Sequence, residues 1–262
     1  MRKTTFIVGG KEITDPLTIK FNVPFGEEEN VDTVEIKVYN LKDSTINGIA
    51  TKTRAILSAG YVDDNGVIFN GTLKKKETKW EGLDKITYFY CSDATDDYIT
   101  ATFKKTYARN TQASVILREL AQAAGLTIAD LDLPIDFTYR SGKVLNGKIK
   151  TLASEIAKDC KAKLFINKGQ MFVRVKSKGD NLGLDISKET GLINQPEEIV
   201  EQKEDKTIKK GYKLKLLLNP RITTDALIRL TSKKVSGTFR VTKGEHKSDG
   251  DTYFTECEVV PA

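Results

Sequence analysis

The sequence is poor in the side chains that carry most enzyme chemistry. Its 262 residues include one histidine, one tryptophan, two methionines and three cysteines. A Ser-His-Asp triad needs a histidine beside its nucleophile, and cysteine zinc sites need closely spaced pairs. Cys91, Cys160 and Cys257 are odd in number, lie far apart and form no C-x-x-C pair, which argues against a disulfide framework or a zinc site. We expect reduced, buried thiols, no metal, no cofactor and no catalytic site.

Long hydrophobic runs are also missing. None approaches the roughly 20 residues that a membrane-spanning helix requires. The N-terminal stretch MRKTTFIVGG has basic residues but no apolar region long enough for a secretion signal. We therefore expect a protein that has no membrane partner and that is used, or assembled into something larger, in a cytoplasm.

Basic residues exceed acidic residues by six, with 42 Lys and Arg against 36 Asp and Glu. An excess of this sign can indicate nucleic-acid binding. The densest basic runs, 73–79 and 207–215, alternate with residues typical of strands, so their charge fits the outer face of a sheet. No nucleic-acid-binding motif accompanies them, and we expect no specific nucleic-acid partner.

Alternating apolar and polar residues dominate the first hundred positions. Leu17–Phe25 and Thr33–Tyr39 each place their apolar side chains on one face. A period of two over this length predicts half-buried strands. Similar patterns predict further strands at 54–61, 67–77 and 84–93, with a turn at 62–66.

The middle of the chain changes to a helical period. The segment NTQASVILRELAQAAG predicts a helix with Asn110 or Thr111 as its N-cap and Gly125 as its stop signal. A second helix is predicted within 147–163, followed by two short strands around a tight turn at 167–170. These elements predict an α/β insertion between two β regions.

The last part of the chain returns to the period of two. Residues 194–206 are charged and predict either a return linker or an exposed strand. The alternating run 212–218 and three later segments predict an antiparallel set whose last two strands are joined by a polar hairpin at 245–251. The fold class is therefore β-rich α+β, with antiparallel β-barrel regions and an inserted helix-strand segment. We predict three parts: a β-barrel region at 1–106, an α/β insertion and return linker at 107–205, and a closing β region at 206–262 that completes the barrels.

The stretch IVGG, Ile7–Gly10, matches the start of a mature chymotrypsin-type serine protease. Such a protease carries its histidine early in the chain. The one histidine here, His246, lies near the C-terminus in the predicted polar hairpin, and the sequence Gly-Asp-Ser-Gly-Gly is missing. The protease hypothesis fails, and IVGG is better explained as a strand that ends at a glycine turn.

The segment GKVLNGKI, Gly142–Ile149, matches the G-x-x-x-x-G-K of a phosphate-binding loop, but Ile149 stands where Ser or Thr would hold Mg²⁺. The alternative is a turn that caps the second helix.

Trp80 is assigned to packing or to an interface. Two sets of turn residues lack the spacing of a calcium loop and are explained by turn geometry: Asp63, Asp64 and Asn65, and His246, Asp249 and Asp251.

Three blocks of the sequence carry a family resemblance. The first is LTIKFNVPFGEEENVDTVEIKVYNL with ILSAGY and VIFNGTL; the second is TQASVILRELAQAAGLTI with KTLASEIAKDCKAKLFINKGQMFVRV. The third and most specific is LLLNPRITTDALIRLTS with VSGTFRVTKGEHKSDGDTYFTECEVV. In order, they resemble the opening tail-tube-like barrel, the inserted helical units and the closing region of the baseplate hub proteins of contractile-tailed phages and phage-tail-like particles.

The resemblance implies a structural, non-enzymatic role. Hubs of this family form a homotrimer in which each subunit contributes two tube-like barrels to a pseudo-sixfold ring. The ring joins the hexameric tail tube to the trimeric spike, so the implied partners are copies of the chain, the tail tube protein, the tape-measure protein, the spike and other baseplate proteins. The implied location is the tail baseplate of a virion that is assembled in the host bacterial cytoplasm.

Two features qualify this expectation. The closing region, 206–262, is short for a whole barrel, so the second barrel is expected to borrow strands from the first segment. The helix-strand insertion is about the size of a small cell-wall-binding unit. A cell-wall or glycan-binding module of a tail or prophage particle is therefore the alternative function.

Overall fold

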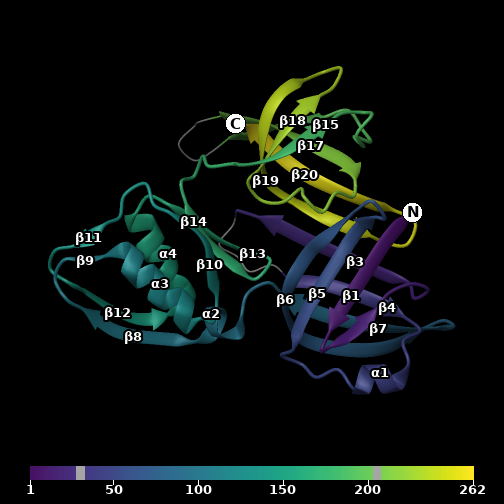
Figure 1. Ribbon diagram of the computed structural model, residues 1–262, viewed down its shortest axis with the longest axis horizontal. Helices are drawn as coiled ribbons and strands as arrows, with labels where there is room; N and C mark the ends of the chain where they lie inside the picture. Colours follow the sequence, from purple (N-terminus) through teal and green to yellow (C-terminus); the bar gives the residue numbers. More distant parts are fainter. Residues whose placement is uncertain (28–32, 203–207) are drawn as a thin grey trace. The chain divides into compact units, whose positions relative to one another are not determined.

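The computed structural model shows a chain of two compact units, drawn in Figure 1. Unit 1 contains residues 1–26, 33–91 and 179–262, and unit 2 is built around residues 92–178. The structure describes residues 1–27, 33–202 and 208–262, with the side chains of 201, 202, 208 and 209 outside the description.

The boundaries of unit 2 differ from those assigned to the insertion from the sequence. Its main segment starts at Ser92 rather than at residue 107, because β8 (Thr102–Tyr107) pairs with β12 (Lys143–Lys148) inside this unit. It ends at Lys178 rather than at residue 205, because β15 (Asp180–Ile186) pairs with β18 (Ala226–Thr231) in unit 1.

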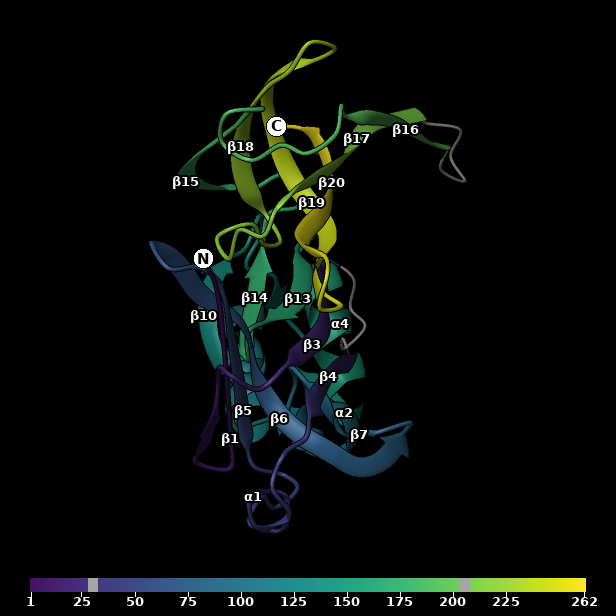
Figure 2. The ribbon, with the colours of Figure 1, turned by 90° about the vertical axis from the view of Figure 1, so that its right-hand side faces the viewer.

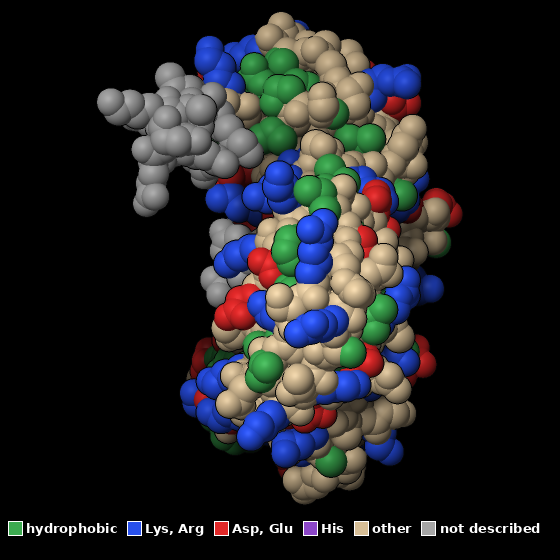
Figure 3. Space-filling view, turned by 90° about the vertical axis from the view of Figure 1, so that its left-hand side faces the viewer, with side chains coloured by type: hydrophobic (Ala, Val, Ile, Leu, Met, Phe, Trp, Pro, Cys, Tyr) green, Lys and Arg blue, Asp and Glu red, His purple; other side chains and the backbone are tan. Residues whose placement is uncertain are grey.

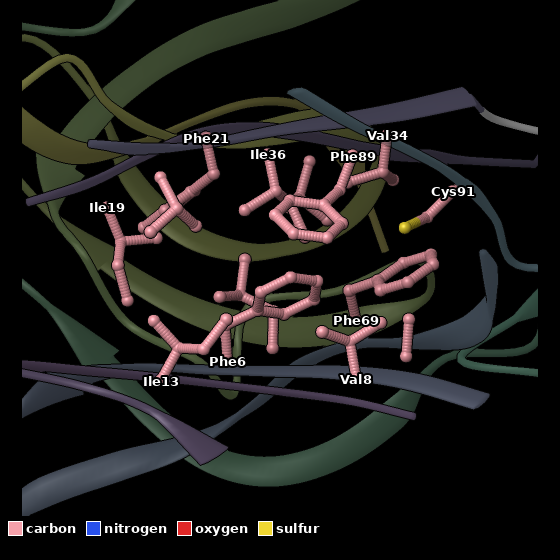
Figure 4. Packing of buried hydrophobic residues seen from close by; sticks show 14 of the residues in the cluster. Phe6, Val8, Ile13, Ile19, Phe21, Val34, Ile36, Phe69, Phe89 and Cys91 are labelled. Carbon is pink, nitrogen blue, oxygen red and sulfur yellow. The ribbon is translucent and has the colours of Figure 1, made fainter. Parts of the chain in front are cut away.

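The first half of unit 1 is a sheet of the order β3-β4-β7-β6-β5-β1-β2 that encloses a core. Figure 4 shows apolar side chains from two facing layers, among them Phe6 and Phe89, whose rings meet edge to face at 5.2 Å. Alternation builds this core: in β3, Phe21 and Val23 are buried and Asn22 is exposed. The strands are β1 (Arg2–Val8), β2 (Lys11–Ile13), β3 (Ile19–Gly26), β4 (Thr33–Tyr39), β5 (Arg54–Tyr61), β6 (Asp64–Glu81) and β7 (Asp84–Ser92), with α1 (Asp43–Asn47) between β4 and β5.

The second half of unit 1 continues the same sheet. It contains β15, β16 (Glu197–Gln202), β17 (Ile208–Leu217), β18, β19 (Ser236–Ser248) and β20 (Tyr253–Pro261) around a second core. Its order is β16-β17-β20-β19, with β18 against the first part of β19 and β15 parallel to β18. The last part of β19 pairs with β3. The closing strands therefore join the first segment through the pairing of β19 with β3.

Unit 2 packs two helices against short strands around its own core. Helix α3 (Ala113–Ala123) and helix α4 (Ile149–Asp159) pack on each other, and β10 (Thr127–Asp132), β14 (Gln170–Arg174) and β13 (Lys163–Asn167) form a small sheet. The turn between β13 and β14 lies where the sequence predicts it. The remaining elements are α2 (Asp96–Thr100), β8, β9 (Thr111–Gln112), β11 (Thr138–Tyr139) and β12.

The predicted N-cap of α3 is wrong. The helix begins at Ala113 and its N-cap is Gln112, because Thr111 is held in β9 and Asn110 has a positive φ of 65°. A carboxylate distant in sequence binds a free N–H group in the first turn of the helix instead. Asp136 accepts hydrogen bonds from the backbone N–H and the hydroxyl of Ser114, at 2.9 and 2.6 Å. Gly125, with φ of 64°, follows the last turn as predicted.

The predicted fold class, β-rich α+β with a helix-strand segment, is confirmed. The prediction of an antiparallel closing set is incomplete, because β15 runs parallel to β18. The small sheet of unit 2 also contains a parallel pair, β10 with β14. Parallel partners come from distant parts of the chain, so local alternation cannot identify them.

A buried ion pair holds the second half of unit 1 together. Arg240 of β19 donates a hydrogen bond to Asp225 at 2.6 Å, and these side chains are 7% and 0% exposed. The backbone of Asp225 also accepts from the N–H of Asp180 and donates to Val241. One residue thus connects the start of β15 with β18 and β19.

We expect Asp225→Asn to lower the free energy of unfolding by about 3–5 kcal/mol, because it removes the negative charge that lies 2.6 Å from the buried Arg240 guanidinium. Asparagine tolerates the positive φ of 67° at this position, so the change isolates the charge. Chemical denaturation measures the effect. Asp185→Asn is the matched control: its pair with Arg229 spans 3.6 Å between side chains that are 65% and 75% exposed, and its loss should cost less than about 1 kcal/mol. Equal effects of the two variants would contradict the prediction.

The three thiols are free and buried, as the sequence indicates. Burial raises the pKa of Cys91 and of Cys257 to about 12, and it also raises the pKa of Cys160. We therefore expect iodoacetamide at about pH 8 to leave all three unmodified in the folded protein, because the thiolate is the nucleophile. The same treatment in denaturant should label three thiols, counted by mass spectrometry. Labelling of the native protein would show that these positions open.

Candidate assembly surfaces

Strand β6 forms a hairpin ribbon with β7 that extends beyond the pairing of β6 with β5, while β4 flanks the other edge of β7. The pairing of β6 with β5 ends at Thr72, opposite Arg54, whereas β6 itself continues to Glu81. Figure 2 shows β6 running on beside β7. Along residues 74–81, no strand within the described residues pairs with the second edge of β6. This edge is open to a partner.

The ribbon carries exposed apolar side chains at its tip. Trp80 is 71% exposed and Leu83 is 97% exposed. Trp80 is therefore mostly unpacked among the described residues, and a role at an interface stays the prediction for it. The sequence alone did not single out Leu83; its place beside Gly82 in a tight turn was the available signal.

Charged and aromatic side chains cover one face of the ribbon. Lys75 and Lys79 both donate hydrogen bonds to Glu77, which lowers the pKa of Glu77 to about 2. The rings of Tyr88 and Tyr90 stack at 6.3 Å, with an ammonium group from Lys79 over Tyr88 and one from Lys75 over Tyr90. The two ammonium groups are exposed and Glu77 is 24% exposed, so these surface ion pairs can exchange partners at little cost.

One end of the sheet is formed by β16, which pairs only with β17 among the described strands. Residues 194–202, for which the sequence predicts a linker or an exposed strand, contain this exposed strand; residues 203–206 lie outside the described residues. Glu197 and Glu198 are exposed on it, and Val200 is 58% exposed. At the base of β16, Glu197, Lys213 and Glu256 line a small polar cleft of about 190 Å³.

The two halves of unit 1 are joined at Tyr253 of β20. Its hydroxyl accepts from the backbone N–H of Gly60 at 2.7 Å and lies 3.0 Å from the carbonyl of Lys3. Its ring meets those of Phe21 and Tyr61 edge to face. A Cβ on Gly60 would lie 2.2 Å from a backbone oxygen of Asp64, so only glycine allows the chain to pass here.

The predicted place of His246 is wrong. It lies in β19, which runs to Ser248, rather than in a polar hairpin, and it is 1% exposed because β3 and β20 flank it. Its Nδ1 is 2.8 Å from the hydroxyl of Thr255. That hydroxyl accepts from the N–H of Asn219 at 3.1 Å, so its proton is available to Nδ1. The histidine is a core residue of the sheet and is inaccessible to a substrate.

The other motifs are parts of the fold. Segment 142–149 is strand β12 leading into α4, rather than a phosphate loop or a capping turn, because its backbone pairs with β8. IVGG ends β1, and Gly9 and Gly10 turn the chain into β2 with φ of 55° and 75°. Asp249 accepts from the N–H of Thr252 in a turn, which lowers the pKa of Asp249. Asp64 contacts Arg221 at 3.1 Å.

No group of three or more His, Cys, Asp or Glu side chains in the described part of the chain could hold a metal ion. No helix among these residues has the length and apolar character needed to cross a membrane. On the face drawn in Figure 3, Lys and Arg side chains form small groups with Asp and Glu among them. That face carries no continuous basic patch of the kind expected for a nucleic-acid site.

The fold is shared with phage and prophage tail proteins. A 43 kDa tail protein of prophage MuSo2 from Shewanella oneidensis superposes with a TM-score of 0.71 at 10% identity, covering 100% of this chain and 98% of that one. A tail protein from Neisseria meningitidis MC58 gives 0.71 at 8% identity, covering 99% and 96%. The E. coli c3393 protein, a type VI secretion component described as similar to the T4 tail proteins gp27 and gp5, gives 0.64 at 6% identity, covering 94% and 74%.

Sequence comparison adds nothing to this likeness. No protein-family model matches the chain, and no curated protein matches it significantly. At identities of 6–10% the likeness establishes the fold. The tail-protein fold that the sequence resemblance implied is thereby confirmed.

We expect Tyr253→Phe to lower the free energy of unfolding by about 1–3 kcal/mol, because the N–H of Gly60 would lose its partner in a buried position. Tyr61→Phe removes a hydroxyl from the neighbouring ring and serves as the control, with a smaller loss. Denaturant titration of both variants provides the measurement. A Tyr253→Phe variant as stable as the parent would show that the hydroxyl does not hold the two halves together.

Proposed function

We propose that the protein is the structural baseplate hub of a contractile phage tail or tail-like particle. Copies of the chain form a homotrimeric ring that adapts the hexameric tail tube to the trimeric spike. The observation that carries the proposal is the match to tail proteins over essentially the whole length of both chains. The order of the three sequence blocks supports the same assignment.

The architecture of unit 1 suits a ring. A single sheet passes through two successive cores, so each subunit supplies two barrel-like halves. Three subunits with two halves each can present six similar surfaces to a hexameric tube. The open edges of β6 and β16 give the sheet a means to continue between subunits, since unpaired strand edges are the usual sites of such continuation.

The partners that follow are further copies of the chain, the tail tube protein, the tape-measure protein, the spike and other baseplate proteins. The location is the tail baseplate of a virion assembled in the host bacterial cytoplasm. The role is non-enzymatic. This role is supported by the likeness of the fold to tail proteins and by the burial of the one histidine, His246, in the sheet.

Deleting the gene from the phage or particle that carries it should abolish complete tails, and supplying the intact protein should restore them, as counted by electron microscopy. The purified protein at high concentration, or mixed with its tube and spike partners, should form a trimer. Light scattering should then show that this protein contributes three times the mass of the 29.2 kDa chain. Particles with normal tails after deletion would overturn the proposal. Retention of the protein on purified cell wall, together with normal tails, would favour the cell-wall or glycan-binding alternative.

A further inference from the structure

The open edges of unit 1 differ in how well they are protected against pairing. Strand β2 has three residues, and β15 is irregular at Gly183, where φ is 63°. Short length and bulges are two devices by which sheet edges avoid partners. Strand β16 has neither, since it pairs with β17 without a register shift over six residues. The distal part of β6, residues 74–81, is of comparable length.

The same two edges carry different charge. Residues 74–81 contain four lysines and two glutamates, whereas Glu197–Gln202 contains three glutamates and no basic residue. The charged ends are accessible: the side chains of Lys75 and Lys79 are 64% and 59% exposed, and that of Glu198 is 53% exposed. Their present partners are Glu77, which is 24% exposed, and Lys210, which is 70% exposed and lies 3.8 Å from Glu198.

These charges decide which edges can meet. Two β6 edges would bring lysines together, and two β16 edges would bring glutamates together, so like charges oppose both symmetric pairings. A β6 edge facing a β16 edge places lysines against glutamates. Charges that exclude wrong partners in this way also select the right one.

Exposed apolar side chains accompany both edges. Trp80 and Leu83 stand at the tip of the β6–β7 ribbon. Near β16, Val200 is 58% exposed, and Ile193 and Leu217 are each 47% exposed. Tryptophan is among the residues that contribute most binding energy when an interface covers them. An interface between these two edges would cover Trp80 and Val200, which lie on the two strands themselves.

We infer that the edge of β6 at residues 74–81 of one copy pairs with the edge of β16 of the next copy. The contact joins two different surfaces of the same chain, head to tail. Repeated contacts of this kind close into a ring when the rotation between subunits allows it. The inference rests on the proposed function, for which it names the subunit contact, and its occupant is a second copy of this chain.

Mixed isotopic labelling tests the contact directly. Full-length chains containing ¹⁴N and ¹⁵N are combined at high concentration and treated with a carbodiimide, which joins lysine amines to carboxylates in contact. We expect mixed-isotope cross-links from Lys75 or Lys79 to Glu197 or Glu198. Cross-links between copies that lie elsewhere, or no association between copies at all, would overturn the inference.

Two variants break the two sides of the contact separately. Trp80→Ala with Leu83→Ala alters the ribbon tip, and Glu197→Lys with Glu198→Lys alters the β16 edge. Each should weaken self-association at least about tenfold in sedimentation velocity, with unchanged circular dichroism because the altered side chains are exposed. Asp63→Lys with Asp251→Lys makes the same charge change in exposed turns and should associate normally.

Mixing the two variants distinguishes a head-to-tail contact from a symmetric one. Each variant keeps one intact edge, so a mixture should form dimers through the one remaining contact and no closed ring. Rings in either variant alone would place the subunit contact elsewhere.

Complementation of the gene deletion separates this inference from the proposed function. If the deletion abolishes tails and both variants restore them fully, the contact is wrong and the hub assignment stands. If the deletion leaves tails intact, the hub assignment fails whatever the cross-links show.

Discussion

The structure depends on one strand, β19, that contributes to the second core and pairs with β3 of the first half of the sheet. Its first residues pair with β18, its whole second part pairs with β20, and its last residues pair with β3. Backbone hydrogen bonds of a strand with neighbours on both sides are satisfied only while both neighbours stay in register. The two halves of unit 1 are therefore a single sheet, and they cannot be separated without leaving those groups unpaired.

Polar side chains support β19 at the points where its neighbours change. The buried pair of Arg240 and Asp225 lies where β18 meets it, and His246 with Thr255 lies where β3 and β20 flank it. Tyr253 then secures β20 to β1 and β5. A sheet held so firmly at its middle leaves its unsatisfied groups at its ends.

Much of this fold could be predicted from the sequence. The strands at 33–39 and 54–61 match the observed bounds, because strict alternation over several residues leaves no other buried face. The N-cap of α3, the strand at 143–148 and the burial of His246 could not be predicted. In each case the deciding partner is distant in sequence: Asp136 for the helix start, β8 for the strand, and β3 with β20 for the histidine.

The features of the protein as a whole can be separated in the same way, into those that the sequence determines and those that only the tertiary structure shows. The sequence by itself determined the β-rich α+β class, the shortage of catalytic groups and the resemblance to tail proteins, because these follow from composition and local period. Only the tertiary structure decided that Trp80 and Leu83 are exposed at a ribbon tip and that β6 and β16 have open edges. Whether a strand edge is open depends on which other strands reach it, and strand pairing joins residues whose separation along the chain no local pattern records.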